Sequence, residues 1–133
     1  MSFKGYEISA IVVCFNEENN IRDCLESLRW CNEIVVVDSF STDGTVEICR
    51  EYTDRVFQRE WTGYREQKAF AHSKATREWV ILVDADERVP PELRAEILDA
   101  LPRYGDRFDA FSVPRLVYYL GRWWWRGGWY PDY

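Results

Sequence analysis

The fold of this chain is decided by one stretch, Trp79-Val80-Ile81-Leu82-Val83-Asp84-Ala85-Asp86-Glu87. An unbroken apolar run that ends abruptly in carboxylates is typical of a strand buried on both faces. In an extended backbone, residues i and i+2 point to the same side, so Asp84 and Asp86 are expected to lie together. Two carboxylates at the carboxyl end of a sheet strand favour a seat for a hard divalent cation. The alternative is a solvated acidic turn after a core strand.

Two earlier stretches have the same form, a predicted buried strand that ends in polar residues. Residues 8–15 are nearly all apolar and lead into Asn16-Glu17, and residues 34–37 lead into Asp38. If the three strands are neighbours in a parallel sheet, their polar ends meet in one acidic crevice. Such a crevice holds a diphosphate only through a bridging cation, and Mg²⁺ or Mn²⁺ suits carboxylate and phosphate oxygens.

Helical patterns alternate with these strands and predict a mostly parallel α/β sheet with right-handed crossovers. Lys68 falls on the small-residue face of one predicted helix, where it either snorkels from a partly buried face or reaches towards a ligand. The remaining expected elements are a helix from Asn16, as N-cap, to about Trp30, helices at 45–52, 64–75 and from Pro90-Pro91 to Leu101, and strands at 54–58, 108–113 and 116–120.

The composition describes one globular domain with a modest negative charge. The chain has 133 residues, 47% hydrophobic and 30% charged, with a net charge of −6. That charge argues against a nucleic-acid partner, because phosphate neutralisation needs a basic surface. The four cysteines form no CxxC pair, which disfavours a zinc site and predicts free thiols in a reducing, cytoplasmic compartment. No signal peptide and no apolar run long enough to span a bilayer is present.

Other catalytic signatures are missing from the sequence. It has no GxGxxG, no Walker A and no GxSxG motif, so dinucleotide, P-loop and serine-hydrolase interpretations have no support. A nucleotidyltransferase would share a similar sheet, but it needs a glycine-rich, basic phosphate loop after the first strand. Here that loop reads Asn16-Glu17-Glu18 and is acidic.

Together these motifs resemble a known family, the family 2 glycosyltransferases. Members of this family have the GT-A fold, which is a Rossmann-like sheet flanked by helices. The resemblance covers essentially the whole chain. Within the family, the chain resembles most closely the bacterial β-glucosyltransferases of lipopolysaccharide core biosynthesis. The segments that carry it, in chain order, are Asn16-Glu17-Glu18, Val35-Val36-Val37-Asp38-Ser39-Phe40-Ser41-Thr42-Asp43-Gly44-Thr45, Gln67-Lys68-Ala69-Phe70-Ala71, Leu82-Val83-Asp84-Ala85-Asp86-Glu87, Tyr119-Leu120-Gly121-Arg122-Trp123 and Gly127-Gly128-Trp129-Tyr130-Pro131-Asp132-Tyr133.

The resemblance implies roles for individual residues in binding a UDP-sugar. Asp38 would hydrogen-bond the uracil ring, and Asp43 lies in the adjoining loop, where capping the next helix is an alternative role. Lys68 would approach the ribose or the diphosphate. Asp86 would ligate the metal, with Asp84 beside it on the ribose or a metal-bound water. The implied nucleotide-sugar site as a whole comprises Cys14, Phe15, Asn16, Glu17, Asp38, Asp43, Lys68, Asp84, Ala85 and Asp86.

Two departures from the family pattern matter. Phe40 stands where the family usually has glycine or a small residue, which predicts a differently shaped loop. The chain also stops at Tyr133, before the region in which family members carry the acidic base that activates the acceptor, so the C-terminal part of the fold is expected to be missing. Asp132 is the sole late acid and a weak candidate for the base. We therefore expect a single domain, with a nucleotide-binding core at 1–107 and the start of an acceptor side at 108–133.

Two functions follow from these expectations. The first is a metal-dependent, inverting transfer of a sugar, glucose by the resemblance, from a UDP-sugar to a lipopolysaccharide-core or related glycan acceptor. The second is a catalytically incomplete nucleotide-binding fragment that self-associates through its aromatic tail. Residues 115–130 are rich in Trp, Tyr and Arg, which fits packing on further chain, a homo-oligomer contact, or peripheral contact with the inner membrane and a lipid-linked acceptor.

Overall fold

The computed structural model describes residues 6–108, 110, 117–119 and 122–124. The chain divides into two compact units, residues 1–103 and residues 104–133. This boundary lies close to the predicted change of role at residue 108, but the division of function between the two parts stays a prediction.

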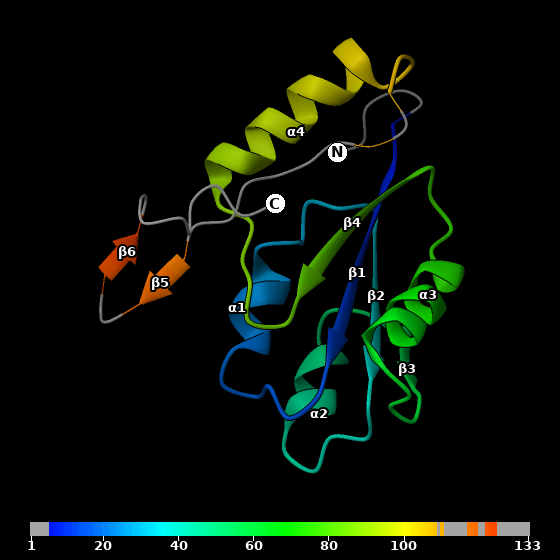
Figure 1. Ribbon diagram of the computed structural model, residues 1–133, viewed down its shortest axis with the longest axis vertical. Coiled ribbons are helices and arrows are strands. Elements are labelled where there is room, and N and C mark those ends of the chain that lie inside the picture. Colours follow the sequence, from blue (N-terminus) through cyan, green and yellow to red (C-terminus); the bar gives the residue numbers. More distant parts are fainter. Residues whose placement is uncertain (1–5, 109, 111–116, 120–121, 125–133) are drawn as a thin grey trace. The chain divides into compact units, whose positions relative to one another are not determined.

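The first unit alternates strands and helices along its whole length (Figure 1). This order confirms the predicted α/β class. Its elements are β1 (Ile8–Cys14), α1 (Ile21–Glu26), β2 (Glu33–Asp38), α2 (Thr45–Cys49), β3 (Val56–Gln58), α3 (Tyr64–Lys74), β4 (Trp79–Asp84) and α4 (Pro91–Tyr104), of which the last runs one residue into the second unit.

The strands of the first unit form one parallel sheet in the order β3-β2-β1-β4. The three strands that end in polar residues are therefore neighbours, with β1 between β2 and β4, as the sequence predicts. Cys14 at the end of β1 pairs with Asp38 of β2, and Val13 pairs with Asp84 of β4. Their carboxyl ends thus lie at one edge of the sheet.

Alternate residues of the central strands feed two separate cores, one on each face of the sheet. Ala10, Val12 and Cys14 of β1 pack with α1 and α2, whereas Ile11 and Val13 face α3 (Figure 1). A strand whose side chains alternate between two apolar layers reads as a continuous apolar run, which explains the sequence pattern of β1 and β2. The two layers fix the sheet between helices and leave its edges as the places where polar groups can gather.

The prediction that the 79–83 strand is buried on both faces is wrong for its outer part. Only Val83 is buried among its apolar residues, and the Leu82 side chain is 49% exposed. The reason is the position of β4, which is an outer strand of the described sheet. A recess of about 360 Å³ lies there, lined by Ile11, Lys68, Ala69, His72, Val80 and Leu82.

The first predicted helix is also shorter than expected. The helical segment is α1, with Asn20 at its N-cap position, so Asn16 is not the cap. Asn16 adopts φ 49° in the preceding loop, where hydrogen bonds to a second loop hold it.

Within the described part of the chain, no helix has both the length and the apolar composition that a membrane crossing requires.

In the second unit, the backbone of β5 (Val117–Tyr119) pairs antiparallel with β6 (Arg122–Trp124). β5 confirms the strand predicted at 116–120, while β6 falls where the sequence shows no clear period. Most of the strand predicted at 108–113 and of the tail at 115–130, as well as Asp132, lies outside the described residues.

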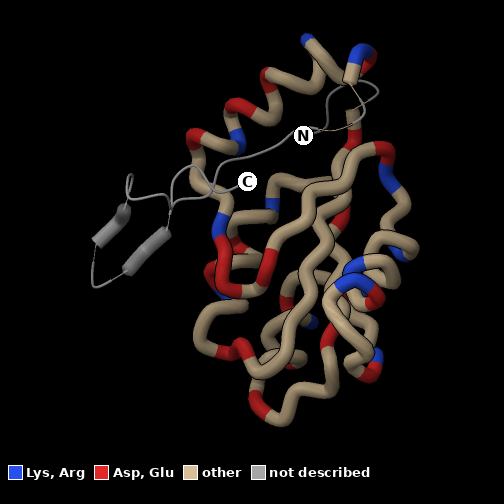
Figure 2. The backbone as a smooth tube through the Cα atoms, in the orientation of Figure 1, with Lys and Arg blue, Asp and Glu red and all other residues tan. Residues whose placement is uncertain are grey.

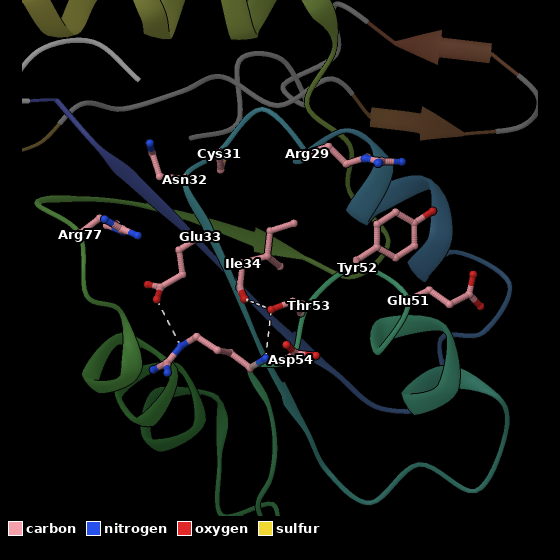
Figure 3. Close-up of a pocket in the computed structure, with 11 residues that line it drawn as sticks. Arg29, Cys31, Asn32, Glu33, Ile34, Glu51, Tyr52, Thr53, Asp54 and Arg77 are labelled. Carbon is pink, nitrogen blue, oxygen red and sulfur yellow. Dashed lines mark hydrogen bonds and ion pairs between the residues drawn. The ribbon is translucent and has the colours of Figure 1, made fainter. Parts of the chain in front are cut away.

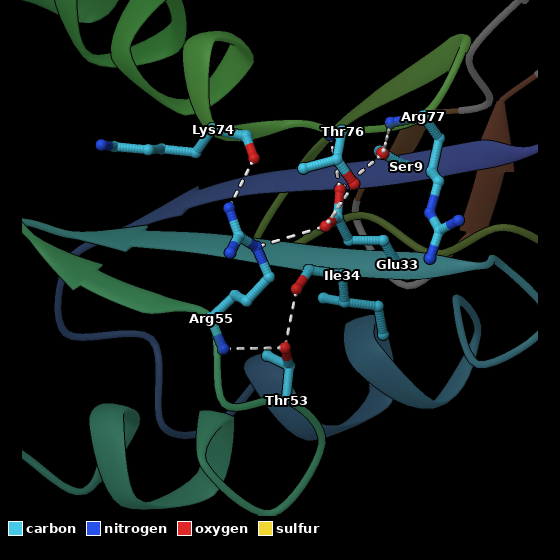
Figure 4. Close-up of polar contacts among 8 residues, drawn as sticks. All are labelled: Ser9, Glu33, Ile34, Thr53, Arg55, Lys74, Thr76 and Arg77. Carbon is cyan, nitrogen blue, oxygen red and sulfur yellow. Dashed lines mark hydrogen bonds and ion pairs between the residues drawn. The ribbon is translucent and has the colours of Figure 1, made fainter.

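The amino edge of the sheet is braced by a charged network (Figure 4). The Glu33 carboxylate accepts hydrogen bonds from the Ser9 hydroxyl at 2.7 Å and the Thr76 backbone N–H at 2.9 Å, and it pairs with Arg55 at 3.2 Å. Burial raises the pKa of Glu33, but these hydrogen bonds and the arginine outweigh it, so the net shift is downward. A pocket of about 510 Å³ beside this network, lined by residues such as Arg29, Tyr52 and Arg77, therefore lies at the edge opposite the polar strand ends (Figure 3).

Candidate functional site

The candidate site is the carboxyl edge of the sheet, where the loops after β1, β2 and β4 begin. The loops after β1 and β4 are acidic in the charge-coloured view (Figure 2). The four-strand order confirms that these loops follow neighbouring strands. This placement makes the edge the natural position for a bound ligand in an open α/β sheet.

The loops after β1 and β2 are tied to each other by hydrogen bonds. The Asn16 backbone N–H donates to the Ser41 hydroxyl at 2.8 Å, and the Asn16 side-chain carbonyl accepts from the Thr42 backbone N–H at 2.8 Å. The Glu17 backbone N–H donates to the Thr45 hydroxyl at 2.9 Å, and the Glu18 carboxylate accepts from the Gly44 N–H at 2.9 Å. Asn16 and Glu17 are thus held in place at the edge by a second loop.

Asp38 is the internal anchor of this loop pair. Its side chain is completely buried, on the face of the sheet covered by α1 and α2. Its carboxylate accepts hydrogen bonds from the Ser41 backbone N–H at 2.8 Å, from the Ser41 hydroxyl and from the Gln58 amide at 3.4 Å. The structure thus places Asp38 beneath the loop, and its predicted contact with a uracil ring stays a prediction.

Cys14 lies beside Asp38 and is equally internal. The thiol donates to the Asp38 carboxylate at 3.4 Å. A hydrogen bond with Cys49, together with burial, raises the pKa of the Cys14 thiol far above its ordinary value. Cys14 is therefore a packed, neutral thiol, while its neighbour Phe15 is 54% exposed at the edge.

Asp84 and Lys68 meet on the other face of the sheet. The Lys68 ammonium of α3 lies 3.7 Å from the Asp84 carboxylate, and it also lies 5.7 Å from the centre of the Tyr64 ring. Both charged side chains are about one third exposed, at 31% and 37%. The structure thus brings these two predicted residues together. Asp84 and Asp38, however, lie at the same edge on opposite faces of the sheet.

Asp86 lies in a turn, so the expected extended backbone beyond Asp84 is wrong. The Glu87 backbone N–H donates to the Asp84 carbonyl at 2.9 Å, and the Glu87 carboxylate accepts from the Asp84 N–H at 2.8 Å. This closed turn leaves Asp86 exposed and Ala85 buried. The carboxylates of Asp84 and Asp86 are accessible to a ligand, although not through the alternation of a strand.

These two carboxylates fit a cation that shares its ligands with phosphate. Among the described residues, no group of three or more His, Cys, Asp or Glu side chains could hold a metal ion. Mg²⁺ does not need such a cage, because it commonly binds one or two carboxylates, several waters and substrate phosphate oxygens. The donor set of Asp84 and Asp86 therefore suits Mg²⁺ or Mn²⁺ in the presence of a diphosphate.

Asp43 precedes Gly44, the N-cap residue of α2, and its carboxylate bonds the first helical residue, which supports the capping role that the sequence left open as an alternative. Its carboxylate accepts from the Thr45 backbone N–H at 3.0 Å and from the Thr45 hydroxyl at 2.5 Å, and its other oxygen accepts from the Glu18 N–H at 3.3 Å. The Thr45 side-chain bond is the main cause of a lowered pKa for Asp43. This residue shapes the edge without needing to touch a ligand.

The Asp43 cap predicts a pH-dependent contribution to stability. Because the folded protein lowers the pKa of Asp43, its carboxylate stabilises the fold above the unfolded pKa of 3.8, and the stabilisation disappears as pH falls through the folded value. We expect Asp43→Ala to lower the denaturation midpoint at pH 7, with a difference from wild type that shrinks as pH falls below 4. Urea unfolding across this range measures it, with exposed Asp54→Ala as control. A difference independent of pH would contradict the prediction.

Gln67 helps to form the site, although the sequence indicated it only as part of the motif Gln67-Lys68-Ala69-Phe70-Ala71 and assigned it no role. It is completely buried in α3, and its amide donates to the Ser39 hydroxyl at 3.0 Å and the Arg59 carbonyl at 3.2 Å. The Arg59 guanidinium in turn donates to the Gln67 carbonyl at 2.9 Å. Its spacing of four residues from buried Ala71 was an available signal, because both lie on one helix face.

Comparisons with known proteins agree with this architecture. The family model for Glycosyl transferase family 2 matches residues 9–132. The lipopolysaccharide core biosynthesis glycosyltransferase LpsC of Rhizobium meliloti strain 1021 is 40% identical over 119 residues, which are 86% of this chain and 44% of that protein. The chain thus spans less than half the length of this relative.

Solved structures share the fold. Residues 1–349 of TarS from S. aureus superimpose with a TM-score of 0.65 and 28% identity over 75% of this chain and 33% of theirs. The glucosyl-3-phosphoglycerate synthase of Mycobacterium tuberculosis, in complex with UDP, gives a TM-score of 0.61 and 26% identity over 72% of this chain and 39% of its own.

Proposed function

Because this chain belongs to glycosyl transferase family 2, we propose that the carboxyl edge of its sheet binds the nucleotide of a UDP-sugar donor. The observation that carries the proposal is the order of the sheet, which sets the ends of β2, β1 and β4 side by side. UDP in the synthase from M. tuberculosis supports a uridine nucleotide as the ligand. The base and ribose would lie over the loops that begin at Phe15 and Ser39.

The diphosphate would lie at the end of β4. Asp84 and Asp86 would hold a Mg²⁺ or Mn²⁺ ion there, and the ion neutralises the charge of the departing UDP when bound. Lys68 would contact a diphosphate oxygen, which the position of its ammonium 3.7 Å from the Asp84 carboxylate supports. The chain thereby supplies one positive group and two carboxylates for a ligand that carries negative charge.

We further propose that the whole protein transfers the sugar with inversion to a glycan acceptor. The acceptor hydroxyl attacks the anomeric carbon opposite the UDP, the bond to the UDP oxygen breaks, and a base takes the hydroxyl proton. Asp132, the weak sequence candidate for this base, lies outside the described residues. Glucose as the sugar rests on the sequence resemblance, while a lipopolysaccharide-core acceptor is also supported by the name of the LpsC relative.

A binding module without turnover is the second candidate, favoured by one observation. The match to this chain covers only 44% of the length of LpsC, so more than half of that relative lies outside the matched part. Donor hydrolysis and transfer assays on this chain and on a version lengthened to the size of the relative would separate the two candidates. Peripheral membrane contact and self-association through 115–130 stay predictions of the same kind.

Metal-dependent UDP binding is the direct test of the proposed function. We expect this chain to bind UDP about 100-fold more tightly with Mn²⁺ than with EDTA, since a divalent ion at a diphosphate contributes about 3 kcal/mol. Titration calorimetry measures both affinities. Glu33→Gln, which alters the brace at the opposite edge, is the matched control and should bind as wild type does. Failure of the folded wild-type chain to bind UDP in Mn²⁺ would overturn the proposal.

A further inference from the structure

Phe40 combines an unfavourable backbone conformation with an exposed aromatic side chain at the candidate site. Its backbone adopts φ 60°, a left-handed conformation that disfavours a bulky side chain. Its side chain remains 54% exposed, so burial does little to offset this cost. Costly backbone conformations that persist in a protein are concentrated at ligand sites, where they position a group for contact.

The residues on both sides of Phe40 are fixed to the body of the protein. The Ser39 backbone N–H donates to the Cys14 carbonyl at 3.0 Å, and the Ser39 hydroxyl accepts from Gln67 at 3.0 Å. Ser41 donates to the buried Asp38 carboxylate and accepts from the Asn16 N–H. Phe40 is therefore an exposed aromatic side chain on a rigid support, at the same edge as exposed Phe15.

The position of this support relative to the proposed phosphate site matches the dimensions of a nucleotide. Phe40 follows β2, and Asp84 ends β4, with β1 between the two strands. Two strand spacings separate the ends by about 9–10 Å. A ribose and its phosphates extend across such a gap, so a diphosphate at Asp84 would bring its base to the loop that carries Phe40.

We propose that Phe40 stacks on the nucleobase of the donor and positions the base. The proposal rests on the proposed nucleotide site and adds to it the group that holds the base. Aromatic side chains stack on bases without needing hydrogen-bond readout, because every base has a π-face. Stacking on a preformed loop also costs little conformational entropy, since the neighbours of Phe40 are already fixed before the ligand binds.

The experiment measures the affinities of uridine and UDP by titration calorimetry, each in EDTA and in Mn²⁺. The variants are Phe40→Gly, which relieves the backbone, Phe40→Asn, which tolerates the same φ without an aromatic ring, and Phe40→Trp, which keeps a ring. We expect Phe40→Gly and Phe40→Asn to weaken the binding of uridine and of UDP alike by about tenfold or more, in both buffers, and Phe40→Trp to bind both as wild type does. Thermal unfolding of Phe40→Gly should show a stability equal to or above that of wild type.

Exposed Tyr104→Ala, which removes a different exposed ring, is the matched control and should leave both affinities unchanged. Folded Gly and Asn variants that bind uridine as wild type does would overturn the stacking role while leaving the proposed function intact. A loss confined to UDP in Mn²⁺ would also overturn it, because it would place Phe40 at the phosphates. A wild-type chain that binds neither ligand would overturn both proposals.

Discussion

Replacement of Asp86 by alanine is expected to weaken UDP binding in Mn²⁺ by about 100-fold, which corresponds to about 2.8 kcal/mol. The reason is that Asp86 is an exposed carboxylate in the turn after β4 and is expected to be a direct ligand of the ion. The same variant should bind UDP in EDTA as wild type does, because only the metal-dependent part of the affinity is removed. Its thermal unfolding should be nearly unchanged, since Asp86 is an exposed turn residue and surface substitutions usually have small effects. Calorimetry in the two buffers measures the first two quantities.

A variant of Asp84 is harder to interpret than Asp86→Ala. Asp84→Asn removes one proposed ligand and also breaks the ion pair with Lys68, so its effect combines two changes. Exposed Glu96→Ala on α4 is a charge-matched control that should leave binding intact. If Asp86→Ala retains wild-type affinity in Mn²⁺, the acidic stretch after β4 is the solvated turn that the sequence allowed as its alternative.

Replacement of Asp38 by alanine is expected to have the largest effect on stability, a loss of about 2–4 kcal/mol in the free energy of unfolding. The carboxylate is completely buried, and its removal leaves the Ser41 N–H and the Gln58 amide without their acceptor. Because Ser41 also accepts from Asn16, the loop pair at the edge should loosen as well. Urea unfolding at pH 7 measures the stability.

The variant also tests whether the loop pair at this edge is needed for binding of the base. We expect Asp38→Ala to weaken uridine binding under conditions where it remains folded, because Phe40 loses its fixed neighbour. Glu33→Gln, which weakens the brace at the amino edge, is expected to reduce stability without changing uridine affinity. A stability loss below about 0.5 kcal/mol for Asp38→Ala, typical of surface substitutions, would contradict the role of a buried anchor.

Asp38 and Asp84 lie on opposite faces of the sheet at the same edge. Asp38 lies with the α1 and α2 layer and supports the loop of Phe40, whereas Asp84 contacts Lys68 of α3. Under the proposed function, we expect one half of the site to position an aromatic surface and the other to present charge. This division matches a nucleotide, which carries an apolar ring at one end and phosphates at the other.

Apolar runs in the sequence were sufficient to predict the parallel sheet and its polar edge. β1 and β2 are buried on both faces because each of their sides packs on a separate helical layer, and such strands carry a continuous apolar run. The same pattern misled for β4, since an outer strand with Leu82 half exposed has the same apolar composition. The limits of α1 were missed because Asn16 looks like a helix cap, yet it bonds Thr42 of another loop.

What the sequence by itself determined is the order of strands and helices in the first unit and the residue types at the three strand ends, because hydrophobic periodicity is local. Only the tertiary structure decided which of those residues support the loops from the buried side and which face solvent. Asp38 and Asp84 look equivalent in the sequence, but the pleat turns them to opposite faces, one buried and one paired with Lys68. Phe40 looked like a departure from a pattern, and the fold turns it into an exposed ring on a braced loop, because contacts between distant loops set its backbone conformation.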